Sequence, residues 1–244
     1  MVPRTVLITG ANRGIGLGLT KTFLEVEGAE IVIAGCRNPE KAEELHKIGN
    51  SKLHIVQLDV TDDASIQKAV GEVDKIVGDK GLNILINNAG VHIPYYTLQE
   101  KPSREDFTKQ LDANITSVVI VTQFFLPLIR KAPSDKKIIN ISSSSGSITN
   151  NRTDTQSFGI QKKLAYRISK TAVNQLTKSL SIDLAEDNIL AVAFCPGWVQ
   201  TDLGGSNGLL TAEQSMAELV PSILKVSKEH NGGFFDKSLV VIPY

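Results

Sequence analysis

Six short apolar segments, rich in β-branched residues, alternate along the chain with segments of helical period. Several are apolar almost throughout, which is typical of parallel strands that are covered on both faces. A repeated strand–helix–strand order favours right-handed crossovers within one sheet, so we predict an α/β fold with a doubly wound parallel sheet of about seven strands between two layers of helices. The predicted strands are residues 5–9, 31–35, 53–58, 83–87, 137–142 and 189–194.

Helix signals occupy the intervening segments. Residues 38–49 are predicted as one helix capped by Asn38, and residues 61–78 as another, capped by Thr61 or Asp62. The length of 244 residues suits one large core, and the sequence contains no internal repeat and no linker rich in Pro and Ser. We therefore predict a single dinucleotide-binding domain over residues 1–244.

Charge and composition exclude several classes of function. The 26 Lys and Arg residues balance the 26 Asp and Glu residues, so no net charge favours nucleic acid or a membrane surface. The longest apolar runs are shorter than the ~20 residues of a membrane span, and we recognise no signal peptide. Cys36, Cys195 and the four histidines show no metal-ligand spacing, so we predict no metal site and a reducing, cytoplasmic setting.

A glycine-rich turn, TGANRGIG, follows the first predicted strand and leads into a segment of helical period. Gly10, Gly14 and Gly16 allow the backbone to turn tightly and to approach a pyrophosphate, and the next helix directs its unpaired N–H groups at that phosphate. A turn of this kind without a ligand is the alternative. The spacing G-x-x-x-G-x-G resembles the cofactor turn of the short-chain dehydrogenase/reductase family, a Rossmann-type fold.

The residues after the second strand indicate which dinucleotide binds. No Asp or Glu stands there to accept a hydrogen bond from a ribose 2′-hydroxyl, and Arg37 follows immediately, while Arg13 lies in the glycine turn. A guanidinium group binds phosphate well, whereas a carboxylate repels it. The two arginines therefore predict NADP(H) rather than NAD, the alternative being two solvated surface charges.

Two further motifs occur at strand ends in the order typical of this family. In LDV, the resemblance implies that Asp59 and Val60 lie beside the adenine ring, although Asp59 could instead start the next helix. In NNAG, we expect Asn87 to tie neighbouring strands together. Ala89 and Gly90 leave room there for the cofactor.

The last of these motifs, PGWVQT, follows the sixth predicted strand. Pro196 and Gly197 turn the chain, and the resemblance implies that the Val199 backbone and the Thr201 hydroxyl hold the nicotinamide carboxamide. The cofactor-binding residues predicted in this way are Gly10, Asn12, Arg13, Gly14, Ile15, Gly16, Arg37, Asp59, Val60, Asn87, Ala89, Gly90, Tyr166, Lys170, Pro196, Gly197, Val199 and Thr201.

The run YRISK places Tyr166 and Lys170 four residues apart, on one face of a long predicted helix. Reduction of a carbonyl needs an acid to protonate its oxygen, and a free phenol with a pKa near 10 is sluggish at neutral pH. We expect the Lys170 ammonium to lower the pKa of Tyr166. The resemblance implies that Lys170 also donates hydrogen bonds to the nicotinamide ribose.

Two more residues complete the predicted catalytic set. INISSSSG aligns with the family's serine motif at Ser143, whose hydroxyl would stabilise charge on the substrate oxygen, and Ser142 and Ser144 stay open as alternatives. Asn114 matches the asparagine that holds a water in a proton relay to the lysine. The resemblance spans residues 5–202 and implies an NADPH-dependent reductase of a small-molecule carbonyl compound, active as a homodimer or homotetramer.

Two irregular segments are expected to border the substrate: a lid at 202–215 and an insertion at about 147–163, which lengthens the chain between Ser143 and Tyr166 beyond most members of the family. The insertion, the helix that follows and the ending GGFFDKSLVVIPY resemble the Sniffer and C-factor subgroup of carbonyl reductases. His92 could line the same cleft. A regulatory or signalling NADP(H)-binding protein with little turnover is the alternative function, but it would need no acid.

Overall fold

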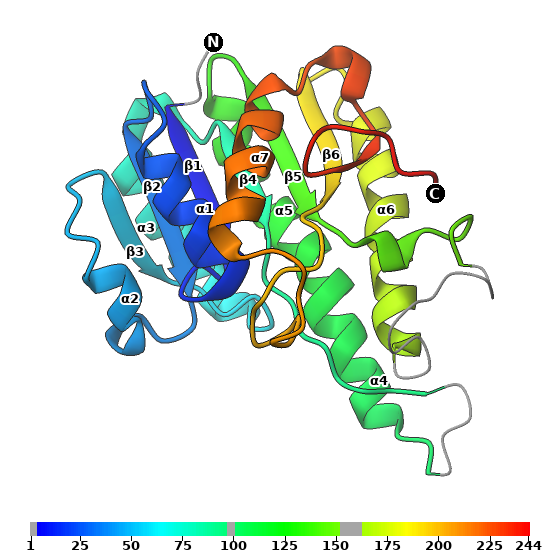
Figure 1. Ribbon diagram of the computed structural model, residues 1–244. Helices are drawn as coiled ribbons and strands as arrows, with labels where there is room; N and C mark the ends of the chain where they lie inside the picture. The colour runs from blue at the N-terminus through cyan, green and yellow to red at the C-terminus, as the bar shows by residue number, and fades with distance from the viewer. Residues whose placement is uncertain (1–3, 97–100, 152–162) are drawn as a thin grey trace.

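The computed structural model describes residues 4–96, 101–151 and 163–244, and it confirms the predicted α/β fold. Seven parallel strands form one sheet in the order β3-β2-β1-β4-β5-β6-β7 (Figure 1). The strands are β1 (Thr5–Thr9), β2 (Ile31–Cys36), β3 (Leu53–Gln57), β4 (Ile84–Asn87), β5 (Lys136–Ile141), β6 (Ile189–Cys195) and β7 (Phe234–Asp236). The strand order reverses between β1 and β4, which in sheets of this kind is where ligands bind.

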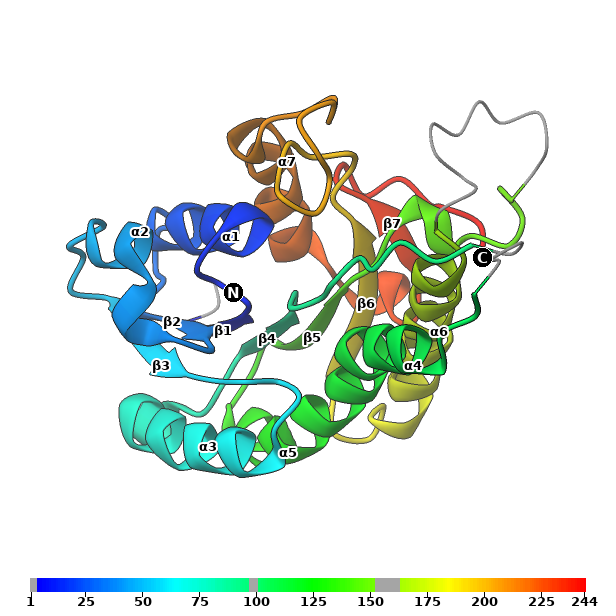
Figure 2. The ribbon, with the colours of Figure 1, turned by 90° about the horizontal axis from the view of Figure 1, so that it is seen from below.

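Helices cover both faces of the sheet (Figure 2). One face carries α1 (Gly14–Leu24), α2 (Glu43–His46) and α7 (Ala212–Lys225), and the other carries α3 (Asp63–Val77), α5 (Ser117–Lys131) and α6 (Leu164–Asp183). Successive strand residues point to opposite faces, so in β1 Val6 and Ile8 join the core under α1 and α7, while Leu7 joins the core under α3 and α5. Burial on both faces explains why the strands are apolar throughout.

The predicted helix caps are mostly present. Asp62 accepts a hydrogen bond from the Ala64 N–H at the start of α3, and that helix ends at Gly78, whose φ of 54° favours glycine. The prediction of one helix over residues 38–49 is wrong: a 3₁₀ turn at Pro39–Lys41 precedes the short α2, and the Asn38 side chain caps neither.

One helical segment combines two helices. The helix α4 (Arg104–Leu111), a π turn (Asp112–Thr116) and α5 run without a break from Arg104 to Lys131. By length and composition alone this segment could cross a membrane, but 50% of its most apolar window is buried inside the protein. We therefore assign it to the core, where α5 packs on the sheet and on α3.

Candidate active site

The glycine turn after β1 has room for backbone only. A Cβ atom on Gly16 would lie 2.2 Å from the Gly10 carbonyl oxygen, and Gly10 itself has a φ of +63° and lies against Ala89. Because α1 begins at Gly14 with no side-chain cap, its first N–H groups are available to an anion. This cradle fits the pyrophosphate of a dinucleotide. Of the other predicted residues here, Asn12 is half-buried in the turn and Ile15 packs on the core.

Asn88 is a residue that the sequence analysis missed. Its side-chain amide donates to the carbonyl oxygens of Thr9 (2.8 Å) and Gly10 (3.2 Å), and its backbone N–H donates to the Thr9 hydroxyl. It therefore joins the loop after β4 to the glycine turn after β1. Asn88 lies in the NNAG motif, but the role expected of Asn87 already explained that motif, so no role was assigned to Asn88.

Asn87 lies where the sequence analysis expects it, tying the central strands together. Its amide donates to Asn140 on β5 at 2.8 Å and to Thr122 on α5 at 3.1 Å. All three side chains are buried. Ala89 and Gly90 follow at the carboxyl edge of β4, with Gly90 against the Asn114 side chain.

The predicted arginine pair is separated in the structure. Arg13 forms an exposed ion pair with Asp202, the first residue of the predicted lid. Arg37 instead lines an open depression of about 630 Å³ at the ends of β2 and β3, together with Lys68 from α3. Among the residues that the structure describes, neither Arg37 nor Lys68 enters an ion pair.

Two carboxylates share this depression, and one oxygen of each already accepts from a local donor. One oxygen of Asp59 accepts from the Thr61 N–H and hydroxyl, and Asp62 caps α3. Asp59 thus precedes the helix as the alternative reading of LDV allows, while Val60 packs on the core beside α3. The depression therefore offers two unpaired cations to an anionic group.

The PGWVQT segment forms a compact loop after β6. Gly197 has a φ of +86°, and the carbonyl of Pro196 accepts from the Ser215 hydroxyl at 2.6 Å. Val199 pairs with Leu210, and the Thr201 hydroxyl accepts from the Gly204 N–H. The predicted lid ends earlier than expected, because α7 begins at Ala212 after a capping box.

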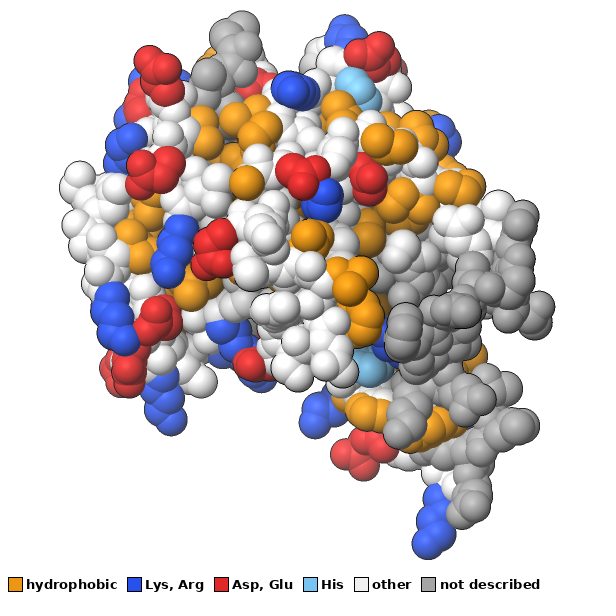
Figure 3. All heavy atoms as spheres, viewed as in Figure 1, with side chains coloured by type: hydrophobic (Ala, Val, Ile, Leu, Met, Phe, Trp, Pro, Cys, Tyr) orange, Lys and Arg blue, Asp and Glu red, His pale blue; other side chains and the backbone are white. Residues whose placement is uncertain are grey.

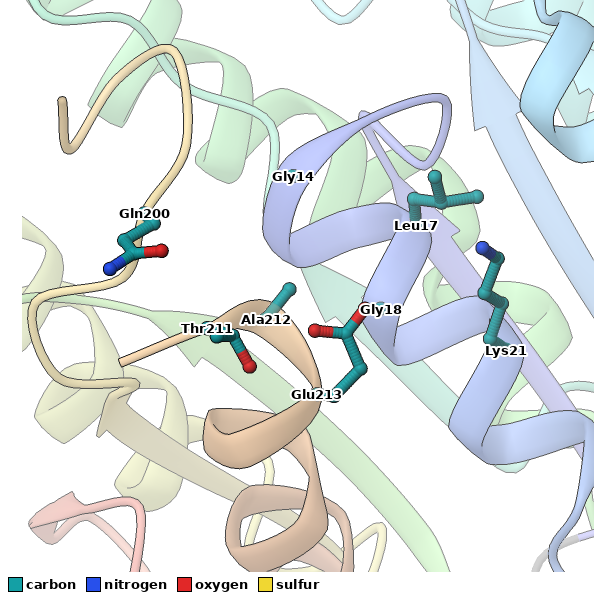
Figure 4. A pocket seen from close by; sticks show the side chains of 8 residues that line it. All are labelled: Gly14, Leu17, Gly18, Lys21, Gln200, Thr211, Ala212 and Glu213. Carbon is teal, nitrogen blue, oxygen red and sulfur yellow. The ribbon is translucent and has the colours of Figure 1, made fainter. Parts of the chain in front are cut away.

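This loop also borders a second open depression, of about 400 Å³, between the start of α1 and the start of α7 (Figure 4). Lys21 from the last turn of α1 and Glu213 from the first turn of α7 also line it. Thr201 is near enough to Gly14 that a Cβ atom on this glycine would be 3.1 Å from the Thr201 methyl group. The lid loop and the glycine turn are therefore in contact.

Tyr166 and Lys170 lie on the first turns of α6, with the Lys170 Nζ 5.7 Å from the centre of the Tyr166 ring. The Lys170 ammonium donates to the Ile141 carbonyl oxygen at 2.8 Å, at the end of β5. Burial lowers the pKa of Lys170 to about 8 and raises the pKa of Tyr166 to about 12. The expected net lowering of the Tyr166 pKa is therefore wrong, because desolvation by burial is the largest contribution to it.

The four consecutive serines differ in what they contact. The Ser143 side chain hydrogen-bonds to the Tyr166 phenol, an interaction that lowers the pKa of Tyr166. Ser142 points away from it and donates to the Asn174 side chain at 2.6 Å, and the Ser144 N–H donates to the Cys195 thiol at 3.2 Å. The geometry thus favours Ser143 over its neighbours as the active serine.

Asn114 lies in the π turn, and such turns are frequent at functional sites. Its side chain is fully engaged, accepting from the Val91 N–H and donating to the Val91 carbonyl and the Ser169 hydroxyl. One turn earlier, the buried Gln110 accepts from the Ile93 N–H at 2.6 Å. Together they hold the loop after β4.

This loop presents His92 to Tyr166. The His92 ring meets the Tyr166 ring edge-on, with 5.4 Å between centroids. The His92 ring therefore lies beside Tyr166, whereas most of the predicted insertion, residues 152–162, lies outside the described residues. Within the described part of the chain, no three His, Cys, Asp or Glu side chains gather as a metal site would require.

Comparisons with known proteins place these features in a family. A family model described as short chain dehydrogenase matches residues 4–209. The short-chain dehydrogenase anuI of Penicillium roqueforti is 33% identical over 250 residues, covering 98% of this chain and 96% of that protein.

Solved structures agree with this match. Sniffer of Caenorhabditis elegans is 43% identical with a TM-score of 0.89, and the NADPH-bound carbonyl reductase from chicken fatty liver is 36% identical with a TM-score of 0.91. Each comparison covers 100% of both chains.

Proposed function

This chain belongs to the short-chain dehydrogenase/reductase family, and on that premise we propose that it is an NADPH-dependent carbonyl reductase. The observation that carries the proposal is the contact between Ser143 and Tyr166, with Lys170 one turn along α6, at the carboxyl edge of the sheet. The glycine cradle after β1 lies at the same edge. A binding protein without turnover would need the cradle but not a buried acid.

The choice of NADPH rests on the charges at the ends of β2 and β3. Arg37 and Lys68 offer two cations that are in no ion pair, and one oxygen of each neighbouring carboxylate, Asp59 and Asp62, is engaged by local donors. A ribose 2′-phosphate carries the charge that such a site stabilises. The NADPH found in the chicken fatty liver reductase supports the same choice.

In the proposed reaction, bound NADPH supplies a hydride to the carbonyl carbon. The Tyr166 hydroxyl gives its proton to the carbonyl oxygen, and the hydrogen bond with Ser143, which lowers the pKa of Tyr166, favours that transfer. The Ser143 hydroxyl donates a hydrogen bond to the same oxygen as charge develops there. Lys170 places a positive charge beside the phenolate that forms, and the product is an alcohol.

We propose an aldehyde, ketone or quinone as the substrate, with its carbonyl oxygen between Ser143 and Tyr166 and near the His92 ring. Acidic and basic side chains are interspersed on the face seen in Figure 3, so charge alone selects no polyanionic partner there. We further propose that the enzyme works in the cytoplasm as a homodimer or homotetramer.

Oxidation of NADPH with a panel of aldehydes, diketones and quinones tests the activity. We expect Tyr166→Phe to bind NADPH with unchanged Kd and to lose about 10²–10⁴-fold in kcat, because only the proton donor is removed. Tight NADPH binding by the wild-type protein with no turnover of any carbonyl would instead support the regulatory alternative. Full activity of Tyr166→Phe would remove Tyr166 from the mechanism.

A further inference from the structure

The Ser143 hydroxyl is carried by a short 3₁₀ turn, Ser144–Gly146, and α6 supports one side of that turn. A Cβ atom on Gly146 would lie 2.7 Å from the Lys170 carbonyl carbon, so the turn sits directly on the helix backbone. The Gly146 carbonyl accepts from the Thr171 hydroxyl at 2.9 Å and from the Asn174 amide at 3.4 Å. These contacts fix one side only.

The other side is held by a segment almost one hundred residues further along the chain, Val240–Tyr244. The Ser147 hydroxyl, which is buried, donates to the Pro243 carbonyl at 2.5 Å. Thr149 donates to the Tyr244 carbonyl twice, from its N–H at 2.9 Å and from its hydroxyl at 2.5 Å. Figure 1 shows this segment, at the red end of the colour bar, reaching toward the loop after β5.

The segment is itself anchored to the sheet. Val241 pairs with Phe235 of β7, and the Ile242 N–H donates to the Phe234 carbonyl at 2.8 Å. The Tyr244 ring stacks on Phe234 with 6.2 Å between centroids, and its hydroxyl donates to the Gly232 carbonyl. The segment therefore holds the loop in a fixed position relative to the edge of the sheet.

Two backbone hydrogen bonds connect this support to the active serine. The Gly146 N–H donates to the Ser143 carbonyl at 2.8 Å, and the Ser147 N–H donates to the Ser144 carbonyl at 3.1 Å. A shift of Ser147 away from Pro243 would open this turn and move Ser143 relative to Tyr166.

We propose that the segment Val240–Tyr244 is a positioning element of the active site, which acts through Ser147 and Thr149 to hold the Ser143 hydroxyl against Tyr166. Ser147 and Thr149 are positioning residues, since neither touches the reacting atoms. The proposal rests on the proposed reductase function for its kinetic readout, but the order of the Ser143 turn can be measured without turnover.

The test combines Ser147→Ala with Thr149→Val in the full chain, with and without Ser143→Ala. Loss of two hydroxyl hydrogen bonds is expected to lower kcat about 10-fold while leaving the Kd for NADPH unchanged. In the Ser143→Ala background the same pair should change kcat less than about 2-fold, because residues that act through one group are not additive. Thr149→Ser, which keeps the hydroxyl, should retain the activity of the wild type.

Ser238→Ala is the matched control. Its hydroxyl donates to Glu218 on α7 at 2.5 Å, in the same part of the chain but away from the Ser143 loop, so activity should not change. Additive losses in the Ser143→Ala background, or full activity of the Ser147→Ala/Thr149→Val variant, would overturn the proposal.

Hydrogen exchange separates this result from failure of the proposed function. In the Ser147→Ala/Thr149→Val variant, the amide protons of residues 143–147 should exchange at least about 10-fold faster, whether or not the protein turns over a carbonyl. Unchanged exchange there would count against the positioning role. An inactive wild-type protein with faster exchange in the variant would count only against the reductase assignment.

Discussion

The cofactor side and the substrate side of the candidate active site are held in shape by different interactions. On the cofactor side, the turn from Gly10 to Gly16 is defined by sterics, because added side-chain atoms would overlap the backbone. On the substrate side, the position of Ser143 and of the loop after β4 depends on hydrogen bonds to side chains such as Asn114, Gln110 and Asn174. Substitutions that disturb this support should therefore cause large losses on the cofactor side and graded losses on the substrate side.

Among substitutions that alter the shape of the site, the largest effect is expected from Gly16→Ala. Its Cβ would lie 2.2 Å from the Gly10 carbonyl oxygen and 2.7 Å from the Asn88 amide nitrogen, so the turn must open. We expect NADPH affinity to fall more than about 100-fold and the Tm to fall as well. Isothermal titration with NADPH and thermal unfolding measure the two effects.

Gly71→Ala is the control for this substitution. Gly71 lies within α3, and a Cβ atom there would meet nothing within 4 Å. It should stabilise the protein by about 0.5–1 kcal/mol, since alanine loses less backbone entropy in a helix. Similar outcomes for the two alanine variants would break the steric account of the cofactor side.

Charge at the same side is tested by Arg37→Asp. Replacing the cation by an anion should raise the KM for NADPH about 100-fold and the KM for NADH less than about 3-fold, because only NADPH carries the 2′-phosphate. Lys68→Gln should give a smaller change in the same direction. Lys75→Gln, on α3 but outside the depression, should give none, and equal losses for both cofactors would contradict the NADP(H) assignment.

The smallest effect concerns the buried ammonium on the substrate side. The Lys170 pKa of about 8 lies below its ordinary 10.5, so the unfolded chain binds more protons than the folded one between these values. Stability should therefore rise with pH across that window, by roughly 2 kcal/mol from pH 7 to pH 10 relative to Lys170→Met. Above pH 10 the raised Tyr166 pKa has the opposite effect.

Urea unfolding of both proteins without cofactor measures this difference. The comparison with Lys170→Met removes the contribution of the exposed lysines. If the difference in the free energy of unfolding between the two proteins does not change from pH 7 to pH 10, the Lys170 ammonium is not desolvated. That result would also count against hydrogen bonds as what holds the substrate side in shape.

The same contrast explains what could be predicted from the sequence. The first six strands are long and apolar on both faces, and the glycine turn needs residues without side chains, so both leave patterns that can be recognised locally. β7 has only three residues, Phe234–Asp236, and was not located because such a length carries no periodicity. The helix predicted at 38–49 is divided at Ala42, whose ψ of 56° is not helical, into a 3₁₀ turn and a short α-helix.

Side-chain partners were harder to predict, because they depend on distant segments. Arg13 pairs with Asp202, which is 189 residues away, and Asn88 donates to Thr9, which is 79 residues away. The direction of the Tyr166 pKa depends on burial, which the spacing of Tyr166 and Lys170 does not reveal. Serines and asparagines are common everywhere, so a network built from them has no compositional signature.

The π turn at Asp112–Thr116 has a mechanical consequence for the helix that contains it. One extra residue in a turn rotates everything after it by about 100° about the helix axis. The helix α4 before the turn can thus face α6, while α5 after the turn faces α3 and the sheet, although both belong to one continuous helical segment. Removing a single residue from the turn would therefore send one half of this helical segment out of phase with its neighbours.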